Sequence, residues 1–140
     1  MSLFLVKIIL AVVLGAIIGA QRSYAHKQAG LRTFALVSLG SCVFVLFVQL
    51  FSTNPEIISR TIANVLVGIG FLGGGVIFFH KDKVFGLTTA AALWCTAAIG
   101  LGVGLGLFKE SIIVSLVVFV ILQFLGFLEN LIKKTKIKNV

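Results

Sequence analysis

The sequence predicts an all-α membrane protein, built as a bundle of about five transmembrane helices. Hydrophobic residues make up 59% of the 140-residue chain and charged residues only 11%, whereas a soluble domain carries about 25% charged residues. The apolar runs are each about 20 residues long, the length that a helix needs to cross the hydrocarbon. They do not alternate apolar and polar residues as barrel strands do. Helices, which satisfy their own backbone groups in lipid, are therefore expected.

Five apolar runs, separated by charged or polar clusters, define the expected spans. They are Leu3–Ala20, Thr33–Phe51, Thr61–Phe79, Val84–Leu107 and Ser111–Ile132. The clearest turn is Asn54–Glu56, which contains the only proline and a residue that can cap the following helix. Glu56 and Arg60 follow at the spacing and in the order that favour a helical ion pair. The transmembrane domain thus takes residues 1–132, and residues 133–140 form a short basic cytoplasmic tail.

Basic residues predict the orientation of this bundle. With five spans, nine of the twelve Lys and Arg residues fall on one side, in the first loop, the third connection and the tail. The other side has Lys7, Arg60 and Lys109. Since short basic loops stay in the cytoplasm, the N-terminus is expected outside and the C-terminus inside. The net charge of +8 therefore serves topology, and no recognisable fold indicates nucleic-acid binding.

Glycines crowd the segment Gly68–Phe78, which contains a GxGxxG pattern. The dinucleotide fingerprint needs a preceding strand and an acid about 20 residues later. Here a membrane span precedes the glycines and Thr88 stands where the acid is needed, so a cofactor site is excluded. Two uses remain open. Gly70 and Gly74 have the spacing that lets helix backbones touch, or Gly73–Gly75 unwinds in mid-membrane and offers carbonyl oxygens to an ion.

Glycines in two other spans also have spacings suited to helix packing. Gly15 and Gly19 stand four residues apart in the first span. The fourth span has a smooth or easily unwound series: Gly100, Gly102, Gly104 and Gly106. Because small residues let backbones approach closely in lipid, we expect a homo-oligomer that forms through glycine faces.

Few polar side chains fall inside the expected spans, and none in mid-span is Asp or Glu. That weighs against a proton pump and against a dehydrated magnesium cage, although a few oxygens could hold a hydrated magnesium ion. Asn64 and the pair Thr88 and Thr89 neighbour the glycine run, and we expect them to form a functional polar cluster. Trp94 lies in mid-span and is expected to pack. No catalytic constellation appears, so no enzyme activity is predicted.

Four stretches in this order resemble the MgtC/SapB family of bacterial inner-membrane proteins. They read GAIIGAQR, AGLRTFALVSLGS, VLVGIGFLGGGVIF after Arg60, and VFGLTTAAALWCTAAIGLGVGLG. Together they cover most of residues 15–106, and their combination is far more specific than any one piece. The matching positions are Arg22, Arg32, Thr33, Arg60, Gly68, Gly70, Phe71, Gly73, Gly75, Gly86, Leu87, Thr88, Ala90, Ala91 and Trp94.

The resemblance implies a multi-pass protein of the bacterial inner membrane that is linked to magnesium homeostasis and, in some pathogens, to survival inside host cells. Two hypotheses follow. The protein regulates or stabilises other membrane proteins, or it transports Mg²⁺ or another small ion; a structural or lipid-interacting role is a third, weaker class. The expected partners are the lipid bilayer, further copies of the chain and another membrane protein. No cofactor is expected beyond transient Mg²⁺.

Two features depart from the family pattern. Gln21 stands where members usually have an acidic residue before the arginine, which removes one of the few carboxylates available for an ion or a salt bridge. Many members also have a cytoplasmic C-terminal domain, whereas this sequence ends at Val140. Any activity that needs that acid or that domain is therefore not expected here.

Overall fold

A computed structural model of the chain describes residues 2–129 and 132. Among them, five helices are long and apolar enough to cross a membrane, which confirms the predicted all-α membrane class and the number of spans. They are α1 (Ser2–Tyr24), α2 (Leu31–Phe51), α3 (Pro55–Gly75), α4 (Leu87–Leu105) and a last span over Phe108–Glu129. The last span starts as α5 (Phe108–Val120) and continues in a short π-helix, η1 (Ile121–Leu125). The predicted tail at 133–140 lies outside the described residues, as does part of the predicted Ser111–Ile132 span.

The third and fourth helices have other bounds than the sequence predicted. α3 begins at Pro55, where Asn54 Oδ1 accepts a hydrogen bond from the Glu56 amide at 2.9 Å. It ends at Gly75, and a two-stranded antiparallel hairpin follows, with β1 (Phe78–His80) paired to β2 (Lys83–Phe85). The predicted spans had included two residues of each strand, Phe78–Phe79 and Val84–Phe85, because the hydropathy of these phenylalanine and valine residues suits a membrane helix as well as a strand.

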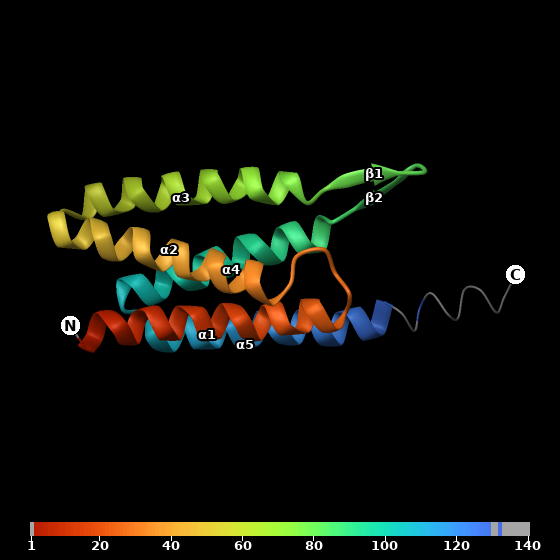
Figure 1. Ribbon diagram of the computed structural model, residues 1–140, viewed down its shortest axis with the longest axis horizontal. Coiled ribbons are helices and arrows are strands. Elements are labelled where there is room, and N and C mark those ends of the chain that lie inside the picture. Colours follow the sequence, from red (N-terminus) through yellow and green to blue (C-terminus); the bar gives the residue numbers. More distant parts are fainter. Residues whose placement is uncertain (1, 130–131, 133–140) are drawn as a thin grey trace, which may run out of the picture.

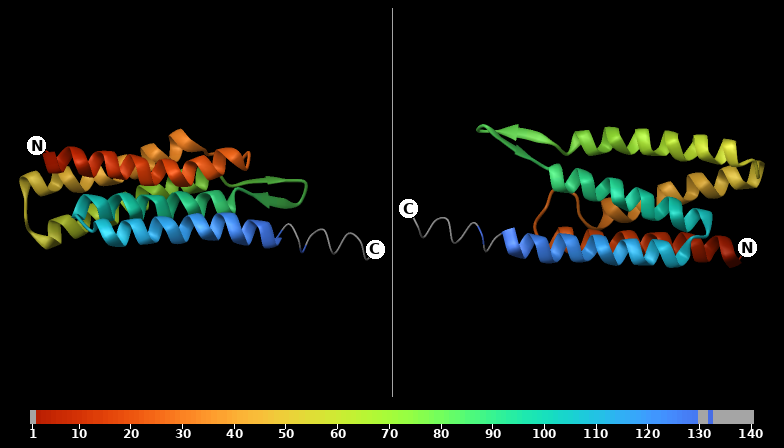
Figure 2. Two further views of the ribbon diagram at one scale, coloured as in Figure 1. Left: turned by 90° about the horizontal axis from the view of Figure 1, so that it is seen from below. Right: turned by 180° about the vertical axis from the view of Figure 1, so that it is seen from behind.

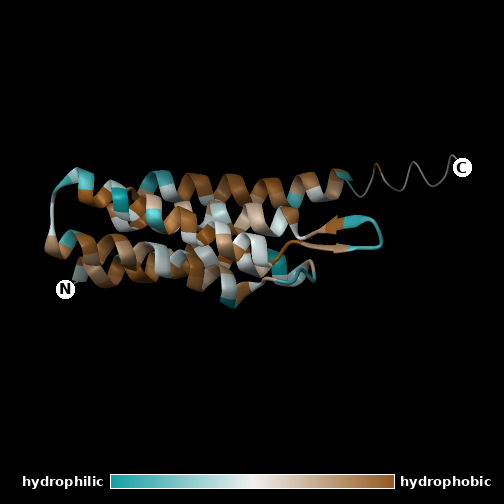
Figure 3. Ribbon diagram, turned by 90° about the horizontal axis from the view of Figure 1, so that it is seen from above, coloured by the Kyte–Doolittle hydropathy of each residue, from teal (hydrophilic) through white to brown (hydrophobic). Residues whose placement is uncertain are grey.

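The connections between helices lie at two opposite ends of the bundle (Figures 1 and 2). The N-terminus, the α2–α3 turn and the α4–α5 turn share one end. The α1–α2 loop, the hairpin and the last part of the α5 span share the other, which we call the basic end. It carries Lys27, Arg32, Lys81 and Lys83. The ribbon is mostly apolar along its length and more hydrophilic toward its ends and at the hairpin turn (Figure 3). Which end faces the cytoplasm stays a prediction.

Glycines let α1 lie directly against α2. A Cβ atom added to Gly15 would stand 2.6 Å from the carbonyl oxygen of Phe34, and one added to Gly19 would stand 2.7 Å from Leu31 Cα. Real side chains do not approach so closely, so each position requires glycine for the observed packing. This confirms helix packing through the glycines of the first span, within one chain, and the homo-oligomer expected through glycine faces stays a prediction.

The other side of α2 lies as closely against α4. A Cβ atom added to Gly100 would overlap the backbone carbonyl of Ser38, and one added to Gly104 would stand 2.9 Å from the Cys42 carbonyl oxygen. α4 is continuously helical through these glycines. Of the two predicted alternatives, the series therefore forms a smooth helix surface and not an unwound segment. α2 is thus held between α1 and α4, and the buried core lies where these three helices meet.

A lysine closes the end of this core. Lys7, in the apolar run of α1, donates from Nζ to the carbonyl oxygen of Gly104 at 2.8 Å. The last carbonyls of a helix have no partner within the helix, and their partial negative charge favours a cation. Lys7 therefore satisfies the C-terminal end of α4, which explains a charged residue inside an apolar helix.

α3 lies at the edge of the bundle, beside α2 and α4 (Figure 1). In its apolar window 11% of the residues are buried, against 56% for α4. Ile69 and Gly73 are its buried residues, and a Cβ atom on Gly73 would stand 3.6 Å from that of Ala90 in α4. α3 is therefore held loosely and exposes most of its surface to lipid.

Candidate functional site

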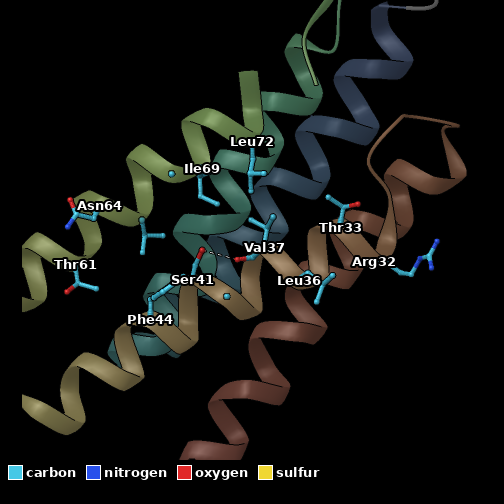
Figure 4. Close-up of a pocket in the computed structure, with 13 residues that line it drawn as sticks. Arg32, Thr33, Leu36, Val37, Ser41, Phe44, Thr61, Asn64, Ile69 and Leu72 are labelled. Carbon is cyan, nitrogen blue, oxygen red and sulfur yellow. Dashed lines mark hydrogen bonds between the residues drawn. The ribbon is translucent and has the colours of Figure 1, made fainter. Parts of the chain in front are cut away.

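A groove of about 1000 Å³ opens between α2 and α3 (Figure 4). Its walls are mostly apolar, with Leu36, Val37 and Phe44 on α2 facing Ile69 and Leu72 on α3. The groove exists because α3 packs on α4 and leaves part of its α2-facing side uncovered. It is large enough for a lipid chain or for one face of another helix.

Polar groups stand at intervals along this groove (Figure 4). Arg32 and Thr33 lie toward the basic end, and Thr61 and Asn64 lie toward the other end. Thr61 donates from its hydroxyl to the carbonyl of Ile57 at 3.1 Å. The exposed amide of Asn64, by contrast, has no hydrogen-bond partner within the described chain. Asn64 lies about 13 Å along α3 from its first residue, a position near the middle of a span that matches a hydrocarbon layer of about 30 Å.

Two glycines make parts of the groove walls smooth. Gly40 on α2 and Gly68 on α3 both line it, and no atom lies within 4 Å of a Cβ atom added to either. Neither glycine is therefore needed for packing within the described chain. Both leave room for the backbone of something that enters the groove.

A second polar site, formed by buried side chains, lies inside the bundle at the end of α1. The side chain of Arg22 is 3% exposed, and its Nη2 donates to Thr89 Oγ1 at 2.6 Å. Its Nε has no hydrogen-bond partner in the described chain, and Arg22 forms no ion pair with a described carboxylate. Arg22 thus ties the end of α1 to the start of α4 without a carboxylate beside it.

The sequence predicted Arg22 in the loop that follows the Leu3–Ala20 span, whereas the structure buries it in the last turn of α1. A signal for this burial was present in the spacing. Arg22 follows Gly15 by seven residues and Gly19 by three, which puts all three on one helical face. That face packs on α2 and α4, so the arginine is carried into the bundle.

Gln21, the residue that departs from the family pattern, also has a defined role. Its Nε2 donates to the Leu122 carbonyl at 3.4 Å and to Gln123 Oε1 at 3.3 Å, both in η1. A π-helical turn disturbs the regular backbone bonding of a helix, and the Gln21 amide supplies a donor there. A carboxylate at this position could not donate those bonds, so glutamine links α1 to the π-helical part of the last span.

The predicted polar cluster of Asn64, Thr88 and Thr89 does not form. Asn64 lies in the α2–α3 groove, Thr89 is buried against Arg22, and Thr88 is exposed. Their closeness to the glycine run in the sequence suggested one cluster. In the fold, Asn64 lies on the side of α3 that faces α2, whereas Thr88 and Thr89 lie in the first turn of α4. Trp94, which was expected to pack, is 52% exposed on the outside of α4.

The glycine triplet does not interrupt α3 in mid-membrane. α3 is helical through Gly73, Gly74 and Gly75, and it ends there because the chain turns into the hairpin. Gly70, Gly74 and Gly75 have no atom within 4 Å of an added Cβ atom. The spacing of Gly70 and Gly74 therefore serves no contact inside the described chain, and this face of α3 stays open.

The remaining charged candidate, Arg60, precedes the groove residue Thr61 on α3 but is not among the residues that line the groove. Arg60 pairs with Glu56 at 3.1 Å on the surface of α3, where their side chains are 78% and 71% exposed. This confirms the predicted helical ion pair, whose contribution to stability is small because both groups are solvated. Among the described residues, no three His, Cys, Asp or Glu side chains gather closely enough to hold a metal ion.

Comparison with known proteins gives a single family. The family model of the MgtC family matches residues 8–131. Protein MgtC of Salmonella typhimurium is 44% identical over 115 residues, which cover 82% of this chain and 49% of that protein. Protein MgtC of Brucella abortus is 44% identical over 111 residues, covering 79% of this chain and 45% of that protein.

An uncharacterized protein of Synechocystis is 42% identical over 116 residues, which cover 83% of this chain and 49% of that protein. The chain thus spans about half the length of these curated relatives. No solved structure matches it.

Proposed function

Since the chain belongs to the MgtC family, we propose that it acts in magnesium homeostasis in the bacterial inner membrane, not as an enzyme but by binding another membrane protein. Through that contact it regulates or stabilises the partner. The observation that carries this proposal is the α2–α3 groove, which opens to lipid and contains an amide without a partner in the described chain.

The shape of the groove suits a transmembrane helix. The part of α2 that lines it runs from Arg32 to Phe44, a length of about 18 Å at the helical rise. Helices associate in lipid chiefly through close packing at small residues. Gly40 and Gly68 provide such positions on the two opposite walls, and neither is occupied by the chain itself.

The polar groups of the groove favour a protein partner over lipid tails. An amide that faces hydrocarbon without a hydrogen bond is unfavourable, whereas interhelical hydrogen bonds in membranes contribute about 0.6 kcal/mol each on average. A partner helix with a polar side chain at the depth of Asn64 would satisfy that amide. Arg32, exposed at the basic end of the groove, would pair with an acidic group on the partner.

Two matched substitutions on α3 test this proposal in cells that lack the protein and grow in limiting magnesium. Gly68→Leu fills the groove, whereas Gly70→Leu adds the same side chain two residues away, outside the groove, and a Cβ atom added at either position meets no atom of the chain within 4 Å. We expect Gly70→Leu to restore growth like the unmodified protein and Gly68→Leu to fail at equal protein level. Full restoration by Gly68→Leu would exclude the groove as the functional surface.

A photo-crosslinking residue identifies the contact directly. Placed at Val65 in the groove, it should give a discrete crosslinked product in the membrane, and the product should disappear in the Gly68→Leu variant. The same residue at Val117, on the exposed side of α5, serves as the control. Equal products at both positions would indicate random collisions.

The alternative is transport of Mg²⁺ or another small ion, and one observation favours it. Hydroxyl and amide groups of Thr33, Ser41, Thr61 and Asn64 line a single groove, and a few oxygens could hold a hydrated magnesium ion. Magnesium flux into liposomes that contain the purified protein tests this, with Arg32→Ala and Asn64→Ala as variants. Flux that both variants abolish would favour transport over regulation.

A further inference from the structure

The hairpin between α3 and α4 projects past the ends of both helices at the basic end (Figures 1 and 2). All six of its strand residues are exposed. Phe79 is 79% exposed, and Phe78, Val84 and Phe85 are each 42% exposed. A two-stranded hairpin is marginally stable in water, and four large apolar side chains on so short an element call for an apolar environment.

The apolar side chains of the hairpin lie on both of its faces. Phe78 pairs with Phe85, their rings stacked with centroids 5.4 Å apart, and Phe79 pairs with Val84. Since alternate strand residues point to opposite faces, the stacked pair is on one face and the Phe79–Val84 pair on the other. A protein surface would cover one face and leave the other wet. Lipid surrounds both.

Helix and strand lengths place these residues at the membrane boundary. The 21 residues of α3 rise about 31 Å, which matches a hydrocarbon layer of about 30 Å. Three strand residues add about 10 Å, slightly more than the headgroup layer of about 5–8 Å on each side. The stacked Phe78–Phe85 pair, at the base of the hairpin, therefore lies near the hydrocarbon edge, and the turn lies at the outer surface of the headgroups.

The turn of the hairpin carries charge at this outer level. His80 pairs with Lys83, and Lys81 and Asp82 form the two-residue turn. Both turn residues have positive φ, 46° and 61°, a conformation for which hairpins prefer Asn-Gly or Asp-Gly. A lysine thus takes a backbone position better suited to asparagine or glycine. Exposed bases outnumber acids at this end, with Lys27, Arg32, Lys81 and Lys83 against Asp82 and Glu129.

We propose that the hairpin is an interfacial anchor that binds the anionic phospholipid surface, with its aromatic base among the headgroups and Lys81 and Lys83 on the lipid phosphates. Aromatic residues favour the membrane interface, and bases near an anionic leaflet add about 1 kcal/mol each. The hairpin fixes the relative depth of α3 and α4, the two helices that it joins. This proposal rests on the membrane spans and not on the proposed regulatory function.

Tryptophan fluorescence tests the proposal in the full-length protein reconstituted in vesicles. The chain has one tryptophan, so Trp94→Phe with Phe79→Trp leaves a single reporter on the hairpin, at a position that is already exposed. Brominated phosphatidylglycerol in mixed vesicles should quench this reporter more strongly than brominated phosphatidylcholine does in vesicles of phosphatidylcholine alone. The native Trp94, about 10 Å along α4 from its first residue, Leu87, should be quenched best by bromine deeper in the acyl chain.

A double substitution of the lysines separates charge from burial. Adding Lys81→Gln and Lys83→Gln should remove most of the difference between the two kinds of vesicle, whereas Arg60→Gln with Lys109→Gln, the same loss of charge at the opposite end, should leave it unchanged. Full quenching by aqueous acrylamide in every vesicle would overturn the proposal by placing the hairpin in water. Protection from both acrylamide and brominated lipid would overturn it in favour of a covering protein.

Discussion

α2 and α3 are consecutive helices of equal length, 21 residues each, yet they pack in opposite ways. α2 has one glycine within its bounds, Gly40, but it lies tightly between α1 and α4 because both neighbours present glycines to it. α3 has five glycines, and four of them meet nothing within the described chain. A glycine permits close helix packing, but that packing forms only where the backbone of another helix lies opposite the glycine. The open glycines of α3 are therefore available to another chain.

The largest expected difference between the tightly packed helices around α2 and the open helix α3 comes from alanine substitutions at two glycines, Gly100 and Gly70. Gly100→Ala places a methyl group on the carbonyl of Ser38, so the backbones must separate, at a destabilisation of about 2–3 kcal/mol. Gly70→Ala meets no atom and gains about 1 kcal/mol of helix propensity if α3 is free to use it. Unfolding titrations of both variants in mixed micelles measure the difference. Equal effects would show that α3 is packed as tightly as α4.

Substitutions of Arg22 test what stabilises the tightly packed part of the bundle, where the end of α1 meets α4. Arg22→Ala leaves a cavity and loses the bond to Thr89, for which we expect a destabilisation of about 2 kcal/mol. Arg22→Met keeps most of the side-chain volume and removes a buried cation, so its stability should lie within about 1 kcal/mol of the native protein. The same titration measures both. If methionine is as harmful as alanine, the charge itself holds the bundle together, through an anion or lipid phosphate.

The smallest expected effect concerns the open side. Gly74→Leu blocks the outer face of α3, where Gly70 and Gly74 meet nothing in the chain, and we expect it to weaken association of copies about tenfold, or about 1.4 kcal/mol. Gly40→Leu, in the groove, should leave association unchanged. The oligomer fraction in lipid nanodiscs, measured by subunit counting, reports both. An unchanged oligomer fraction in Gly74→Leu would mean that this face of α3 contacts lipid and not another copy of the chain.

Much of the fold could be predicted because a membrane imposes rules that each segment obeys separately. Apolar length predicts a span, and the sorting of bases predicts which connections share an end. The errors lay where one local property fits two structures. Phe78–Phe79 and Val84–Phe85 are apolar enough for a helix and aromatic enough for a strand, and Val76 and Ile77 gave no sign that α3 would end at Gly75.

The candidate site was less predictable than the fold. Arg32, Thr33 and Asn64 were named from the sequence and do line one groove, but the sequence did not indicate a groove. Arg22 and Thr89 were both named, yet their contact across 67 positions could not be foreseen. Each depends on how far one helix is rotated against another, and that rotation is set by all five helices together.

The sequence by itself determined the membrane class, the five spans and the charge difference between the two ends. These follow from the free energy of transferring one segment at a time into hydrocarbon. The tertiary structure alone decided which glycines meet a backbone, that α3 stands apart with an open groove, and that Arg22 enters the core. Packing in lipid has no hydrophobic driving force between helices and depends on the fit of particular surfaces, which exist only once the helices are placed.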